Sequence, residues 1–230
     1  FFFAFQVYAD FAGYSLIAAG LAALFGYRLP QNFNFPYISQ SVTEFWKRWH
    51  MSLSAWLKDY LYIPLGGNRH GRARTYLNLM IVMFLGGLWH GAALSYAVWG
   101  TCHGIALAIE RFFAKGEISR AVSWPAQVLR VMVVFAFVSF AWLLFKLPNF
   151  DEVLLYLRAM IANRSMPPIY WYLLVIGLFS LPVVLYHIAY LLRTSIAVAM
   201  IRFGPGCYGA LLAAIVLNAG PSSAFIYFQF

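Results

Sequence analysis

Charge is scarce in this sequence. Only 10% of its 230 residues are Asp, Glu, Lys or Arg, whereas a soluble domain carries about 25%. Hydrophobic residues make up 63% and aromatic residues 20%, and the mean hydropathy is +0.73. These values exclude an ordinary soluble domain and indicate a membrane protein.

Cysteine and acidic residues are also few, which excludes several kinds of site. The two cysteines, Cys102 and Cys207, lie far apart and neither has a second cysteine close by. A metal site built from His50, His90, Cys102 and His103 lacks HxxxH or CxxC spacing, so we predict no metal. A Ser-His-Asp triad is weakly supported, because G-x-S-x-G is absent.

The net charge is +9, but it does not predict a nucleic-acid partner. The 16 basic residues are scattered between apolar runs and form no continuous stripe for phosphates. Segments 28–75, 110–130 and 193–206 together hold 13 of them. The positive-inside rule therefore places these segments on the cytoplasmic side of a membrane.

The opening residues, FFFAFQVYAD, contain no initiator methionine and no signal peptide. We expect residues 1–230 to form a single membrane domain, the C-terminal part of a longer protein. Candidate membrane spans are long apolar stretches at residues 1–27, 124–145, 169–192 and 207–230.

The 35 residues between Arg74 and Glu110 carry no charge. As one helix they would extend ~52 Å, against a hydrocarbon core of ~30 Å. The run must therefore break, either crossing twice or entering and leaving on one side. The motif GGLWHGA places Gly86, Gly87 and Gly91 around His90, and we predict the break at these glycines.

Residues 44–61, EFWKRWHMSLSAWLKDYL, are too polar to span a membrane. Drawn as one helix, they place Trp49, His50 and Leu53 on an apolar arc, opposite Lys47 and Lys58. This pattern predicts an amphipathic helix lying in the membrane interface. A new helix start at one of the serines in this segment remains an alternative.

The five histidines differ in how strongly the sequence supports a functional role. His90 lies within an apolar run, where an ionisable group is expensive unless it serves a function, and imidazole suits proton abstraction. A packing role for His90 is equally consistent with the residues alone. His50 has a similar but weaker case. We expect His187 and His103 to be packing residues and His70 to be solvated.

Four stretches together resemble the membrane-bound O-acyltransferase (MBOAT) family, and within it the bacterial branch that contains the alginate O-acetyltransferase membrane subunit. In chain order they are YADFAGYSLIAAGLAALFGYRLPQNFNFPY, FWKRWHMSLSAWLKDYLYIPLGGNR, NLMIVMFLGGLWHGA and WGTCHGIAL. The resemblance is dense from about residue 8 to residue 112. One departure is Leu16, where the branch commonly has an aspartate.

The resemblance implies an all-α, multi-pass transmembrane bundle with broken or re-entrant helices around a tunnel. It implies transfer of an acyl group, most often acetyl, from a cytoplasmic thioester such as acetyl-CoA, with no permanently bound cofactor. The acceptor would be an exported polysaccharide or a periplasmic acetyl-transferring partner. The protein itself would lie among the lipids of a bacterial inner membrane. The family's catalytic histidine falls on His90 and its second characteristic histidine on His50.

Two rival hypotheses come from other classes. A transporter or proton-relay protein also uses intramembrane histidines and broken helices, but it predicts paired halves. The only repetition in the chain is a histidine–glycine pair, in W-H-G from Trp89 and in C-H-G from Cys102, and it is too short to indicate two matching halves. The other rival is a non-catalytic membrane scaffold for a periplasmic acetyltransferase, which would tolerate loss of His90.

Overall fold

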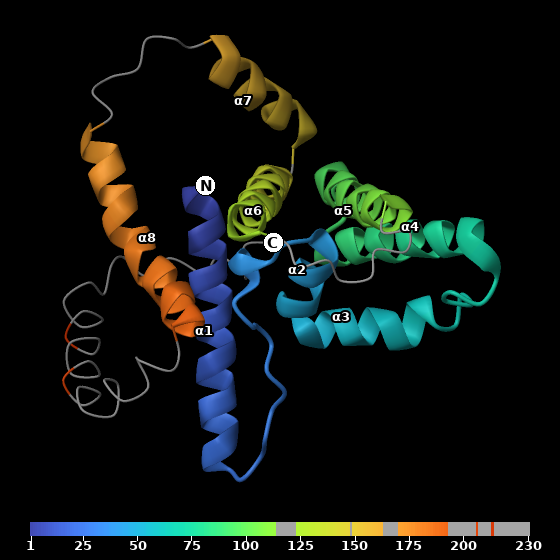
Figure 1. Ribbon diagram of the computed structural model, residues 1–230, viewed down its shortest axis with the longest axis horizontal. Coiled ribbons are helices and arrows are strands. Elements are labelled where there is room, and N and C mark those ends of the chain that lie inside the picture. The colour runs from blue at the N-terminus through green and yellow to red at the C-terminus, as the bar shows by residue number, and fades with distance from the viewer. Residues whose placement is uncertain (114–122, 148, 163–169, 193–205, 207–212, 214–230) are drawn as a thin grey trace.

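The computed structural model describes residues 1–113, 123–147, 149–162 and 170–192, together with Gly206 and Ala213. Within these residues it contains helices and no strand, which confirms the all-α prediction (Figure 1). Two short turns of helix accompany the α-helices, a 3-10 turn (η1, Pro36–Ile38) and a π-helical turn (η2, Lys58–Tyr62). The α-helices are α1 (Phe2–Leu24), α2 (Val42–Arg48), α3 (Met51–Leu57), α4 (Gly71–His90), α5 (Leu94–Phe113), α6 (Trp124–Lys146), α7 (Phe150–Ala162) and α8 (Tyr170–Leu191).

Helices α1, α6 and α8 are long and apolar enough to cross a membrane. They coincide with three of the four predicted spans. The fourth, 207–230, lies almost wholly outside the described residues. Helix α8 lies beside α1, and α6 contacts α1 and α5 (Figure 1). Proline at the second residue of α6 is tolerated, because the first turn of a helix needs no backbone donor there.

The uncharged run between Arg74 and Glu110 folds back on itself as a hairpin of α4 and α5. The helices approach so closely at Gly87 and Gly100 that a Cβ on Gly87 would lie 2.2 Å from the Tyr96 carbonyl oxygen. The predicted break is confirmed at Gly91, where α4 has ended. It is wrong at Gly86 and Gly87, which lie inside α4 because their missing side chains serve close helix packing.

The single interfacial helix predicted for 44–61 is also wrong. The structure divides it into α2 and α3, with the break at Trp49 and His50. The turn is held by the preceding loop, which donates one backbone hydrogen bond to it and accepts another from it. Asn34 N–H donates to the Arg48 carbonyl at 2.9 Å, and Met51 N–H donates to the Asn32 carbonyl at 2.9 Å.

An aromatic core lies where α1, α2, α5 and α6 meet. Trp142 of α6 lies between two other indoles, with its ring centroid 5.0 Å from that of Trp49 and 5.6 Å from that of Trp99. All three are nearly inaccessible to solvent. Rigid aromatic packing therefore holds the end of α2 against α5 and α6.

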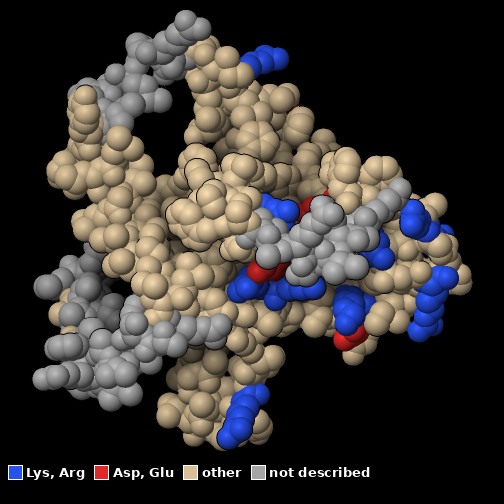
Figure 2. Space-filling model, viewed as in Figure 1, with Lys and Arg blue, Asp and Glu red and all other residues tan. Residues whose placement is uncertain are grey.

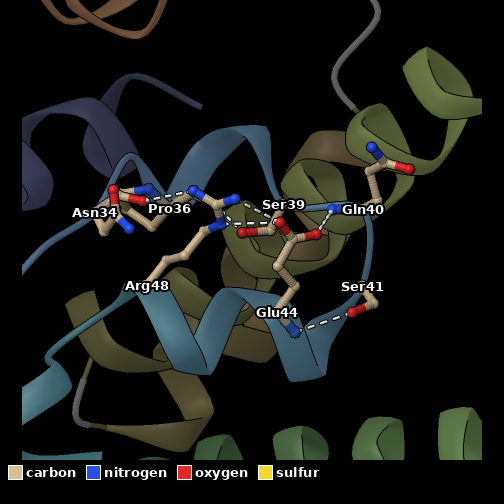
Figure 3. Close-up of polar contacts among 7 residues, drawn as sticks. All are labelled: Asn34, Pro36, Ser39, Gln40, Ser41, Glu44 and Arg48. Atoms are coloured by element: carbon tan, nitrogen blue, oxygen red, sulfur yellow. Dashed lines mark hydrogen bonds and ion pairs between the residues drawn. The ribbon is translucent and has the colours of Figure 1, made fainter. Parts of the chain in front are cut away.

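A polar network fastens the loop before α2 to that helix (Figure 3). The Ser41 side chain caps α2 by accepting from Glu44 N–H at 2.9 Å. Glu44 in turn accepts from Gln40 N–H at 2.8 Å and pairs with Arg48 at 2.8 Å. Arg48 also donates to the Asn34 carbonyl at 3.0 Å. The loop and α2 are thus held as one unit.

Glu110 of α5 supplies a second cap for α2. Its carboxylate accepts from Val42 N–H and, at 2.9 Å each, from the backbone N–H and the hydroxyl of Thr43. Glu110→Ala should therefore lower the free energy of unfolding of the full-length protein by about 0.5–2 kcal/mol. Thermal unfolding in detergent measures this loss. Asp59→Ala, at an exposed carboxylate, is the control, and equal effects of both would contradict the capping role.

Basic side chains gather over α2, α3 and α4 in Figure 2, whereas the same face over α8 shows none. Those exposed to solvent there include Lys47, Lys58, Arg69, Arg72 and Arg74. Segment 193–206 lies almost wholly outside the described residues, as does part of 110–130, so the common cytoplasmic side of the three basic segments stays a prediction.

Candidate active site

His50 lies in the turn between α2 and α3, outside the three spanning helices. Its backbone is left-handed, with φ 44° and ψ 55°. A residue other than glycine adopts this region at a cost of about 1–3 kcal/mol and only where its surroundings enforce it. The enforcement comes from the backbone bonds of Arg48 and Met51 to the loop at Asn32 and Asn34.

The imidazole of His50 is buried, and its Nδ1 is held by polar neighbours. Nδ1 lies 3.2 Å from the Asn32 Oδ1 and 3.4 Å from the Ser52 hydroxyl. Its Nε2 is buried with no hydrogen-bond partner in the described part of the chain. Burial first, and then the nearby His90, lower the pKa of the His50 imidazole from 6.5 to about 4, so it is neutral at neutral pH.

His90 is the last residue of α4. Its ring is walled by aromatic side chains, with centroid distances of 4.9 Å to Phe145 and 5.5 Å to Trp99. The chain can turn directly after it because Gly91 has no side chain, and the Tyr96 ring fills that space. Among the described residues His90 makes ring contacts and no hydrogen bond.

The end of α4 brings the two predicted histidines to one place. The Trp89 ring contacts both, with its centroid 5.0 Å from that of His90 and 6.4 Å from that of His50. Phe11 of α1 packs edge-on against His50 at 4.7 Å. Two neutral imidazoles in aromatic surroundings can accept a proton and orient a hydroxyl group.

His103 lies near this pair, because the Trp99 ring contacts both His90 and His103. It is fully buried in α5, where its Nδ1 accepts a hydrogen bond from the Trp46 indole N–H at 3.3 Å. The rings of Trp99 and Phe137 pack against it at 4.9 Å and 5.1 Å. This surrounding is consistent with the packing role predicted for His103, although its buried Nε2 has no hydrogen-bond partner among the described residues, and the role stays a prediction.

His187 is buried beside the rings of Tyr8 and Phe35, which is consistent with its predicted packing role, and its Nε2 has no hydrogen-bond partner among the described residues. Its Nδ1 donates to the Val183 carbonyl of the same helix at 2.8 Å. It lines an apolar cavity of about 220 Å³ between α1, α6 and α8, which also includes Tyr37 and Phe135. Neither His50 nor His90 lines this cavity. His70 is exposed, as expected.

The structure adds Asn32 and Ser52 to the site. Both lie within stretches that carried the family resemblance, yet neither had a predicted role. The Ser52 hydroxyl donates to Asn32 Oδ1 at 2.9 Å, and the Ser52 N–H points to the same oxygen at 3.3 Å. NFNFPY contains two asparagines, Asn32 and Asn34, and an amide side chain offers both a donor and an acceptor, but the sequence does not indicate which of them contacts His50.

Comparison with known proteins finds similarity over the part of the chain that holds His50 and His90. The family model described as "MBOAT, membrane-bound O-acyltransferase family" matches residues 1–150. The chain is 51% identical over 144 residues to "Probable alginate O-acetylase AlgI" of Pseudomonas aeruginosa, covering 63% of this chain and 27% of that protein. It is 41% identical over 160 residues to "Peptidoglycan O-acetyltransferase" of Helicobacter pylori, covering 70% of this chain and 30% of that protein.

A more distant relative is "Teichoic acid D-alanyltransferase" of Bacillus subtilis. It is 32% identical over 151 residues, covering 60% of this chain and 38% of that protein. The chain therefore spans between 27% and 38% of the length of these three relatives. The residues that the family model matches include both His50 and His90.

Proposed function

The chain belongs to the membrane-bound O-acyltransferase family, and from this we propose that the full-length protein transfers an acyl group. Acetyl is the acyl group that we propose. The donor is a cytoplasmic thioester such as acetyl-CoA. The acceptor is a hydroxyl group of an exported polysaccharide or of a periplasmic carrier partner. Residues 1–230 act as one membrane domain of a longer protein in a bacterial inner membrane.

The observation that supports this reaction most directly is the placement of His90. It stands at a helix end with no competing hydrogen bond among the described residues, and Trp89 connects it to the second histidine, His50. A general base needs a free ring nitrogen and a positioned neighbour. The rings of Phe145 and Trp99 pack against the half-buried His90 ring and cover part of it.

In the proposed step, His90 accepts the proton of the acceptor hydroxyl while the hydroxyl oxygen attacks the thioester carbonyl. A carbon–oxygen bond forms and the carbon–sulfur bond breaks. The proton passes from His90 to the leaving thiolate, so the products are an ester and a free thiol. His50 orients the attacking hydroxyl.

The names of the relatives support a polymer acceptor. Two are named as O-acetylating enzymes, of alginate and of peptidoglycan, and the third as a D-alanyltransferase of teichoic acid. All three polymers are rich in hydroxyl groups. The higher identity to the alginate relatives makes an alginate-like exported polysaccharide our first choice of acceptor.

The function is tested in the bacterium that makes the protein. Deletion of its gene should remove ester-linked acyl groups from the exported polysaccharide, and the full-length gene should restore them. The measurement is ester content of the purified polymer before and after mild alkaline hydrolysis. An unchanged ester content in the deletion strain would contradict the proposal.

A further inference from the structure

The tautomer of His50 can be deduced from the atoms around Asn32. This residue lies in the loop between α1 and η1, and its side chain is half-buried. One atom, Oδ1, lies within hydrogen-bond distance of three groups. These are the His50 Nδ1 at 3.2 Å, the Ser52 hydroxyl at 2.9 Å and the Ser52 backbone N–H at 3.3 Å.

The orientation of the Asn32 amide follows from two of its neighbours. A backbone N–H can only donate, so the atom that faces Ser52 N–H must be the amide oxygen and not the amide nitrogen. The nitrogen then faces the Ser15 hydroxyl of α1, to which it donates at 3.1 Å. Both ends of the amide are satisfied in this orientation alone.

The amide oxygen accepts, so the His50 Nδ1 beside it must carry the proton. The Ser52 hydroxyl gives its own hydrogen to Asn32, and it therefore presents a lone pair to Nδ1 as well. A neutral imidazole with Nδ1 protonated has an unprotonated Nε2. That Nε2 is the buried atom that lacks a partner in the described part of the chain, on a side chain only 8% exposed.

We propose that Asn32 is a positioning residue, which fixes the Nδ1–H tautomer of His50 and so presents Nε2 to the bound substrate as a hydrogen-bond acceptor. The inference rests on the proposed function. It gives His50 a defined part in the reaction: Nε2 accepts a hydrogen bond from a second donor group of the bound acceptor, which orients the attacking hydroxyl so that its own hydrogen points to His90. The hydrogen bond from the Asn32 side-chain amide to the Ser15 hydroxyl connects this arrangement to the spanning helix α1.

Asn32→Leu in the full-length protein tests the proposal. Without the amide oxygen the tautomer is no longer fixed, and acyl transfer should fall about 10- to 100-fold, as when an orienting partner of a histidine is removed. Asn34→Leu is the matched control. It lies in the same loop and is half-buried, but only its backbone makes hydrogen bonds among the described residues.

Asn32→Asp separates positioning from simple structural support. A carboxylate still accepts from Nδ1–H and from Ser52 N–H, so transfer at alkaline pH should stay near that of the unaltered protein. Its negative charge raises the pKa of His50 and favours the imidazolium, whose Nε2 donates instead of accepting. The acid limb of the pH–rate profile should therefore move to higher pH, which a structural role would not produce.

The outcomes distinguish a failure of the inference about Asn32 from a failure of the proposed acyl-transfer function. Full transfer by Asn32→Leu, or equal losses in Asn32→Leu and Asn34→Leu, overturns the inference. So does an Asn32→Asp variant that is as weak as Asn32→Leu at every pH. His90→Ala is assayed alongside: its inactivity keeps the proposed function standing whatever the asparagine variants show, and its full activity ends both.

Discussion

Replacing His90 with alanine in the full-length protein should lower acyl transfer by about 10²- to 10⁴-fold, the contribution of a general base. The ring lies at the end of α4 against Trp99 and Phe145, where alanine leaves no group able to accept the hydroxyl proton. Membrane insertion should not change. The measurement is ester content of the exported polysaccharide, normalised to the amount of the protein in the membrane.

His70→Ala is the matched control for this result. His70 precedes the same helix at its other end and is exposed, so its loss should leave ester content unaltered. The His90 variant also separates the rival hypotheses. A membrane scaffold for another acetyltransferase would keep full activity without His90, and a transporter or proton relay would lose transport while the polymer stayed acylated.

Gly87→Ala should destabilise the protein by about 1–3 kcal/mol, the usual cost of forcing an extra group into close packing. A Cβ at this position would lie 2.2 Å from the backbone oxygen of Tyr96, and a backbone atom cannot rotate away as a side chain can. Helices α4 and α5 must then separate. Thermal unfolding of the purified full-length protein in detergent measures the loss.

Gly20→Ala provides the control, because a Cβ on Gly20 of α1 meets nothing within 4 Å. The same substitution there should be neutral or stabilising, since alanine favours helix over glycine. Because Gly87 lies one turn before His90, its replacement should also reduce acyl transfer. A Gly87→Ala protein as stable and active as the Gly20→Ala protein would show that the hairpin is not closely packed.

The spanning helices were predictable because hydropathy over some 20 residues depends little on neighbours. Helices α1, α6 and α8 match the stretches predicted for them. The breaks were harder to place. A glycine in an apolar run marks either a bend or a close approach of two backbones, and the sequence does not distinguish the two. Gly91 is the first kind, whereas Gly87 is the second.

The site was predictable in part. His50 and His90 stood out as ionisable groups in apolar surroundings, and the structure places them around Trp89. The role of Asn32 was not predictable, because its contact with His50 spans 18 residues of sequence. It also requires the turn at His50, whereas the helical pattern of 44–61 predicted an unbroken helix there.

The central claim, that this histidine pair carries acyl transfer, is tested most directly with the purified full-length protein in lipid vesicles. A labelled acetyl thioester is mixed with the acceptor polysaccharide, and ester formation is followed within a single turnover. The account predicts transfer by the unaltered protein, transfer lowered about 10²- to 10⁴-fold in His90→Ala and a large loss in His50→Ala. Transfer by His90→Ala at the rate of the unaltered protein would contradict it.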